Sequence, residues 1–205
     1  SGVSLDLEHV QEFLADPGRL VRRQPVALQV LEVLLLGDLA GYWSHRLFHG
    51  RTLWRFHAVH HSSEHLDWLA ASRIHVLDSV VIRAVTFIPL FVLGFSNYAI
   101  LAYLVFVSFH AIFIHANVGF QFGWLDWVIA TPRFHHWHHA IEPRAVDKNF
   151  AVHLPLVDWL FGTCLLPKNE WPSGYGIAGR PVPENYLGQV LYPFVRKRRR
   201  TPVTG

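Results

Sequence analysis

The sequence predicts an all-α fold: an integral membrane helical bundle that carries histidine-rich segments on one side of the membrane. Two observations lead to this expectation. Of the 205 residues, 51% are hydrophobic and only 16% are charged, which is typical of a membrane protein with polar segments. A long apolar stretch also lies between two segments that contain most of the 15 histidines. The length suits one domain, residues 1–205, with a substantial core.

Three membrane helices are expected from the apolar runs. The first covers residues 26–50 and continues directly into the first histidines. Residues 76–94 and 97–115 are expected to form a helical hairpin, because this stretch is long enough for two spans and is interrupted at Gly94-Phe95-Ser96-Asn97.

The charges predict which side of the membrane the histidines occupy. The turn of the hairpin carries no Lys or Arg, whereas the segments on both flanks do. Cytoplasmic loops are enriched in these residues, so both flanks and their histidines are expected in the cytoplasm. The same reasoning makes the chain an integral membrane protein with its candidate site on the cytoplasmic side.

The two ends of the chain are polar. Residues 1–25 form an amphipathic segment that is expected at the membrane interface. Residues 196–205 form a basic tail, and a basic cluster beside a membrane usually faces anionic headgroups. Because aromatic and basic residues are not interleaved, no nucleic-acid partner is expected.

Histidines are concentrated in three short motifs, one HxxxH and two HxxHH. On a helix, positions i, i+3 and i+4 share one face, so each motif is expected to point its imidazoles at one spot. The eight candidate ligands in these motifs are His45, His49, His57, His60, His61, His135, His138 and His139. Eight are too many for one tetrahedral zinc site and suit two metal ions. Cys164 is the only cysteine, so imidazole and carboxylate are the available ligands.

Three further histidines border the hairpin. His115 ends the last apolar helix on the same side as the motifs and is expected to be a ligand. His75 opens the hairpin and is expected to be a ligand or the partner of one. His110 lies five residues before His115, so it is either a ligand or a buried, hydrogen-bonded residue. His9 and His153 are interpreted as ordinary polar residues.

These motifs together resemble the fatty acid hydroxylase / sterol desaturase superfamily over residues 38–195, although Val76 stands where the family has proline. The matching elements are Asp38-x-x-x-Tyr42-Trp43-x-His45-Arg46-x-x-His49, His57-x-x-His60-His61-Ser62-Ser63-Glu64, Arg73-x-His75 with Asp78, His115-Ala116-Asn117, Thr131-Pro132-Arg133-Phe134-His135-His136-Trp137-His138-His139, Asp147-x-Asn149-Phe150, Leu154-Pro155-Leu156-x-Asp158 and Phe161-Gly162-Thr163. The resemblance leaves the substrate open, because Ser62-Ser63-Glu64 is similar to alkylglycerol monooxygenases and Arg73-x-His75 to other branches.

The resemblance implies a membrane enzyme whose cytosolic helical cap, residues 116–195, helps to hold two iron ions, with zinc as a possible substitute during expression. The implied reaction is O2-dependent hydroxylation of an unactivated C–H bond in a lipid or sterol-like substrate. Desaturation, or metal binding without oxygenase activity, are the alternatives. A zinc hydrolase is disfavoured by the lack of HExxH, and a b-type haem protein by the clustering of the histidines. Without a nucleotide fingerprint or an Fe–S cysteine set, electrons are expected from a separate transfer protein.

Carboxylates and amides near the motifs are expected to hydrogen-bond the ligand imidazoles and fix their tautomers. The candidates are Asp38, Glu64, Asn117, Asp147 and Asn149, with Asp67, Asp78 and Asp126 as further ones. Asp38 is the favoured one, because a carboxylate within an apolar helix is costly without a partner. The sequence contains no methionine, and related proteins have another membrane helix before the first histidine helix, so a longer parent protein is expected.

Overall fold

The computed structural model describes residues 16, 18–179 and 181–195. Within these residues the regular structure is helical, apart from an isolated antiparallel bridge between Ala140 and Tyr175. The predicted basic tail, His9 and most of the predicted interfacial segment lie outside the described residues. The described part of that segment contains one short helix, α2 (Arg19–Arg22).

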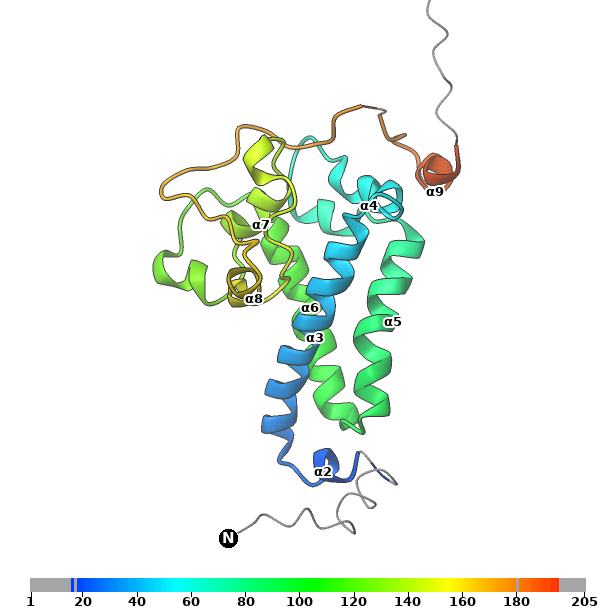
Figure 1. The fold of residues 1–205 in the computed structure, drawn as a ribbon, viewed down its shortest axis with the longest axis vertical. Coiled ribbons are helices and arrows are strands. Elements are labelled where there is room, and N and C mark those ends of the chain that lie inside the picture. Colours follow the sequence, from blue (N-terminus) through cyan, green and yellow to red (C-terminus); the bar gives the residue numbers. More distant parts are fainter. Residues whose placement is uncertain (1–15, 17, 180, 196–205) are drawn as a thin grey trace, which may run out of the picture.

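Three long helices form the body of the molecule: α3 (Val26–Phe48), α5 (Val76–Val92) and α6 (Asn97–His115). Helix α3 packs against both α5 and α6, with α2 at one end of the bundle and the histidine-bearing segments at the other (Figure 1). The hairpin between α5 and α6 turns at Gly94, whose φ of 80° is readily adopted only by glycine. The Ser96 side chain then caps α6 by accepting a hydrogen bond from the Ala99 amide.

A small core holds the bundle together. Val33 of α3, Leu90 of α5 and Tyr103 of α6 are almost completely buried against one another. Gly37 allows this close approach, because a Cβ atom there would lie 2.4 Å from the Tyr103 hydroxyl oxygen. An alanine at this position would therefore force either the Tyr103 side chain or the two helices to shift.

The outer surface of the bundle is apolar. Helices α3 and α6 are both long and apolar enough to cross a membrane, and only 33% of the apolar window of each is buried. Leu31, Leu35, Val105 and Phe109 are among the exposed side chains. Such a surface is unfavourable in water and suits contact with lipid. Helix α5 has 17 residues and is about 25 Å long, at the lower limit for a span.

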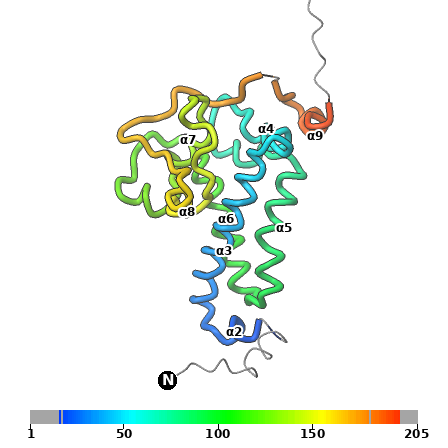
Figure 2. The backbone as a smooth tube through the Cα atoms, in the orientation of Figure 1, coloured from blue at the N-terminus to red at the C-terminus, as the bar shows by residue number. Residues whose placement is uncertain are grey.

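Short helices and loops cover the histidine-bearing end of the bundle. They comprise α4 (Trp54–His61), η1 (Trp68–Ser72), η2 (Gly123–Trp127), α7 (Pro132–His138), η3 (Pro143–Ala145), α8 (Pro155–Leu160), α9 (Tyr186–Leu191) and η4 (Tyr192–Phe194). After α8 the chain passes over this end of the molecule and reaches α9 on the far side of α4 (Figure 2).

Candidate metal centre

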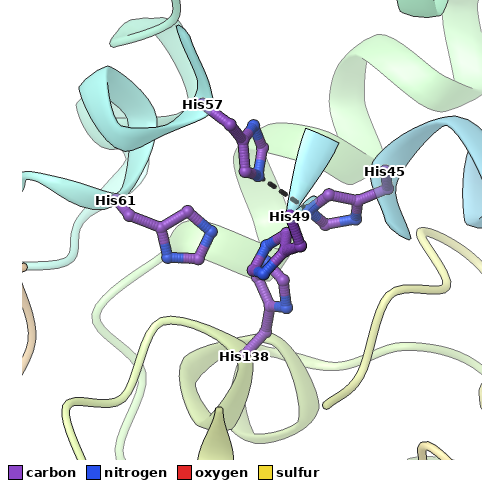
Figure 3. A group of neighbouring side chains, drawn as sticks. All are labelled: His45, His49, His57, His61 and His138. Atoms are coloured by element: carbon purple, nitrogen blue, oxygen red, sulfur yellow. Dashed lines mark hydrogen bonds between the residues drawn. The ribbon is translucent and has the colours of Figure 1, made fainter. Parts of the chain in front are cut away.

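Nine of the eleven predicted metal ligands gather in two adjacent groups. In each group, one potential ligand atom per residue lies within 4.8 Å of those of the others. The first group is His45, His49, His57, His61 and His138, whose rings point toward one another (Figure 3). The second group is His60, His115, His135 and His139.

The two HxxHH motifs divide their imidazoles between the groups. Helix α4 gives the i, i+4 pair His57 and His61 to the first group and His60 to the second. The motif on α7 does the reverse, giving His135 and His139 to the second group and His138 to the first. Each motif therefore faces both groups, whereas the i, i+3 and i+4 spacing predicted that each would face one spot.

Hydrogen bonds at Nδ1 fix the tautomers of the first group. Nδ1 of His45 donates to the Phe150 carbonyl oxygen over 2.8 Å, and Nδ1 of His138 donates to the Lys148 carbonyl oxygen over 2.8 Å. A carbonyl oxygen only accepts, so both protons reside on Nδ1. The Nε2 atoms consequently present lone pairs toward the centre of the group.

The second group is oriented in the same way. Nδ1 of His60 donates to the Arg73 carbonyl oxygen over 3.0 Å, and Nδ1 of His115 donates to the Ala111 carbonyl oxygen over 2.7 Å. The Nε2 atoms of these two histidines lie 3.2 Å apart. Because neither carries a proton, this contact cannot be a hydrogen bond and brings two lone pairs together.

The spacing of the Nε2 atoms fits a metal ion. Nε2 of His45 lies 3.0 Å from that of His57, and Nε2 of His135 lies 3.0 Å from that of His115. Two imidazole nitrogens that bind one ion at a right angle, with bonds of about 2.1 Å, are about 3.0 Å apart. The Nδ1 hydrogen bonds leave lone pairs on the facing Nε2 atoms of His45 and His57 and on those of His60 and His115. Facing lone pairs repel each other unless a cation lies between them, so these residues fit the two metal ions that the motifs predict.

Three more ring nitrogens support this fit. Nε2 atoms of His49, His61 and His138 are buried and have no hydrogen-bond partner among the described residues. An unpaired buried polar atom costs on the order of 1–3 kcal/mol. A metal ion in the first group would satisfy all three atoms at once.

Burial also keeps these imidazoles neutral. It lowers the pKa of His61, His138 and His139 well below the ordinary value, and neighbouring histidines lower it further. At neutral pH the rings are therefore deprotonated and have a free lone pair, which is the form that binds a metal.

Two predicted ligands lie outside both groups. His75 caps α5 by accepting a hydrogen bond from the Leu77 amide, and its Nε2 donates to the Val190 carbonyl oxygen over 3.1 Å. His110 donates from Nε2 to the Ala130 carbonyl oxygen over 2.9 Å. The ring nitrogens named here are thus engaged in hydrogen bonds to the backbone, and for His110 such a hydrogen-bonded role was one of the two expected alternatives.

The predicted partners of the imidazoles have varied roles. Asp147 lies 3.3 Å from Nδ1 of His49, in the place expected of such a partner. Asp38 instead accepts three backbone amides of the segment before α8, and Asn149 bonds backbone groups of Phe134 and Leu165. Glu64 and Asn117 are exposed.

The roles of two residues, Asp78 and His136, were not singled out from the sequence. The Asp78 carboxylate lies 2.6 Å from Nδ1 of His57, although Asp78 was only one of several candidate partners. His136 accepts a hydrogen bond from the Tyr175 hydroxyl at Nδ1 and donates from Nε2 to the Ala116 carbonyl oxygen. A fourth histidine within the His135–His139 segment was the available signal for a structural partner.

A cavity of about 940 Å³ adjoins the first group. His49, His61 and His138 form part of its wall, and Ile141, Val146 and other small or apolar residues form much of the rest. The three unpaired Nε2 atoms described above belong to residues of this wall. The cavity can therefore bring an apolar molecule next to the first histidine group.

Comparisons with known proteins identify a matching family and similar proteins. The model of the fatty acid hydroxylase family matches residues 30–163. The chain is 35% identical over 177 residues to ornithine lipid hydroxylase OlsE of Rhizobium tropici, an alignment that covers 86% of this chain and 53% of that protein.

More distant similarity extends to alkylglycerol monooxygenases. The identity is 30% over 134 residues for that of Xenopus tropicalis, covering 65% of this chain and 29% of that protein. It is 34% over 128 residues for that of Homo sapiens, covering 62% and 28%. The chain thus spans about half the length of the ornithine lipid hydroxylase and less of the monooxygenases. No solved structure gives a significant match.

Proposed function

The chain belongs to the fatty acid hydroxylase family, and we propose that it hydroxylates an unactivated C–H bond of a lipid with two iron ions held by its nine clustered histidines. The observation that supports this most strongly is the convergence of the Nε2 lone pairs in two neighbouring groups. The similar proteins are a lipid hydroxylase and monooxygenases, which are oxidoreductases. Their names favour hydroxylation over desaturation.

In this proposal the nine clustered histidines would hold two iron ions, which would supply the chemistry of O2 activation, and the protein would supply ligands, orientation and a shaped cavity. Hydroxylation inserts one oxygen atom into a C–H bond and releases the other as water, which consumes two electrons and two protons. The Nδ1 hydrogen bonds of His45 and His138 would hold these rings in place throughout. Asp78, held against His57, would offset part of the positive charge of the ion in the first group.

The 940 Å³ cavity beside the first group is the proposed reaction chamber. Its apolar part, which includes Ile141, Val146 and Ile177, would bind a hydrocarbon chain, and Arg51 and Glu64 line it as polar groups. A lipid held in this way would place a methylene group beside His49, His61 and His138. Water would be displaced from the chamber by the chain itself.

Placement in the membrane completes the proposal. The whole chain would act as one catalytic domain, with α3, α5 and α6 in the bilayer and the residue 116–195 cap in the cytoplasm. The distribution of Lys and Arg around the hairpin supports this orientation. A separate electron-transfer protein would deliver electrons from the cytoplasmic side, because the sequence contains neither a nucleotide fingerprint nor an Fe–S cysteine set.

The test is oxygen incorporation. Purified protein loaded with ferrous iron would be incubated with bacterial lipid extract, a chemical or protein electron donor and 18O2, and the lipids analysed by mass spectrometry. We expect a product 18 mass units heavier than one substrate lipid, because hydroxylation adds one 18O atom. A product two mass units lighter would identify a desaturase. Turnover without 18O incorporation, or intact two-iron protein without turnover on any extract, would contradict the proposal.

A further inference from the structure

A second cavity, of about 210 Å³, lies within the bundle between α3, α5 and α6. Gly41, Ile82, Phe87 and Val107 contribute to its largely apolar wall. None of the nine clustered histidines lines it, so it is separate from the chamber beside the first group. We refer to it below as the bundle cavity.

Arg83 is the one charged side chain among the described residues that line the bundle cavity. It lies in α5, eight residues after His75 and therefore about 12 Å along the helix from the histidine-bearing end. Its Nε donates to the Ser79 hydroxyl over 3.3 Å, and no carboxylate in the described part of the chain pairs with it. Arg83 is exposed, so its guanidinium group lies at the edge of the cavity, and within a membrane helix such a charge is costly without a counter-charge.

The polar groups on the opposite wall cannot supply that counter-charge. His110 donates from Nε2 to the Ala130 carbonyl oxygen, so its Nδ1 accepts the proton of His153 Nδ1 over 3.1 Å. Nε2 of His153 then accepts from the Tyr103 hydroxyl over 3.2 Å. This chain of hydrogen bonds is neutral and satisfied within itself. The described lining of the cavity therefore offers Arg83 no counter-charge, and the acid group of a bound molecule would supply one.

We propose that the bundle cavity binds an anionic amphiphile, with its carboxylate or phosphate group paired to Arg83 and part of its hydrocarbon chain in the apolar part of the cavity. A guanidinium group matches both acid groups through paired hydrogen bonds. The apolar walls of the cavity and the position of Arg83 on a bundle helix favour an amphiphile over a free anion. The inference requires the α5 helix to lie in lipid but does not require metal binding or turnover.

Binding of radiolabelled oleate to the purified full chain in non-ionic detergent would test this proposal. We expect Arg83→Gln to raise the dissociation constant roughly 10- to 100-fold, which is the effect of losing a charge-assisted hydrogen bond. Arg83→Lys keeps the charge and should retain most of the affinity. Arg23→Gln removes an exposed arginine outside the cavity and should have no effect.

Competition and cavity-filling measurements distinguish the source of the acid group and the place where it binds. Dioleoyl phosphatidate should compete with oleate, whereas oleyl alcohol and inorganic phosphate should compete weakly. Ile82→Trp, which fills the cavity, should weaken oleate binding while leaving Arg83 in place. Metal content and melting temperature, measured on the same preparations, would show that each variant is folded.

Three results would overturn the proposal. Equal oleate affinity in wild type and Arg83→Gln would mean that Arg83 simply extends toward the headgroup layer. Full affinity in a folded Ile82→Trp variant would place the ligand elsewhere. Effective competition by inorganic phosphate would identify a site for a free anion. A protein that bound oleate through Arg83 yet held no metal would contradict only the proposed function.

Discussion

The Asp78 carboxylate and the His57 imidazole form a buried pair, with Oδ2 of Asp78 2.6 Å from Nδ1 of His57. They belong to different helices, α5 and α4, and are 21 residues apart in the sequence. The pair fixes the His57 tautomer and raises the basicity of its Nε2 atom. Through this pair, the bundle helix α5 orients a proposed metal ligand that α4 carries.

Replacing Asp78 with Asn should therefore weaken the first metal site selectively. The amide keeps an oxygen that can accept from His57 but loses the charge, and such changes typically cost 10–100-fold in metal affinity or activity. Elemental analysis across an iron titration should show the loss of about one ion per chain. Asp67→Asn is the control, because Asp67 caps η1 and contacts no histidine of either group. Unchanged iron affinity in Asp78→Asn would refute this role.

Single ligand substitutions should separate the two proposed ions. His61→Ala removes a ligand of the first group and His139→Ala one of the second. Each variant should abolish turnover and lower the iron content from near two toward one ion per chain. His65→Ala should change neither, because His65 is exposed and belongs to neither group. Full iron content in both ligand variants would argue against the assignment of these residues.

His110 should act on stability and leave metal binding intact. Replacing it with Ala leaves the Ala130 carbonyl oxygen and His153 Nδ1 without their partner, which costs about 1–3 kcal/mol for each buried group. Thermal unfolding in detergent should shift to lower temperature while the iron content stays near two. A loss of one ion at unchanged stability would instead make His110 a ligand, the other possibility that the sequence analysis raised.

Asp38 should be essential for holding the cap on the bundle. Its carboxylate accepts the backbone amides of Val152, His153 and Leu154 over 2.8–3.0 Å. Asp38→Leu leaves these three donors unpaired, so we expect destabilisation on the order of 3 kcal/mol or more. Asp38→Asn, which still has an accepting oxygen, should recover part of this loss. Unfolding curves for both variants measure the difference, and equal stability of Asp38→Leu and wild type would exclude this role.

The proposed orientation can be checked with cysteines in a Cys164→Ser background. A cysteine at Ser96, in the α5–α6 turn, should not react with a membrane-impermeant reagent applied from the cytoplasm. A cysteine at His65, on the histidine-bearing side, should react readily because this residue is exposed. Labelling of position 96 from the cytoplasm would contradict the proposed insertion of the hairpin.

The sequence by itself determined the helices of the bundle and the residue type, histidine, of the candidate ligands. Predicted helices at residues 26–50, 76–94 and 97–115 correspond to Val26–Phe48, Val76–Val92 and Asn97–His115 in the structure. These features are local, because an apolar run of sufficient length and a turn signal act on neighbouring residues. The i, i+4 spacing within each histidine motif is local in the same sense.

Only the tertiary structure decided how the histidines were divided between the two groups. The division of each HxxHH motif between two groups depends on which helix packs against each face of α4 and α7, and spacing alone does not contain that information. The same holds for Asp78, which contacts His57 across two helices, and for Asp38, which contacts backbone more than 100 residues away. Hydrogen bonds over such separations are set by packing, so they appear only once the chain has folded.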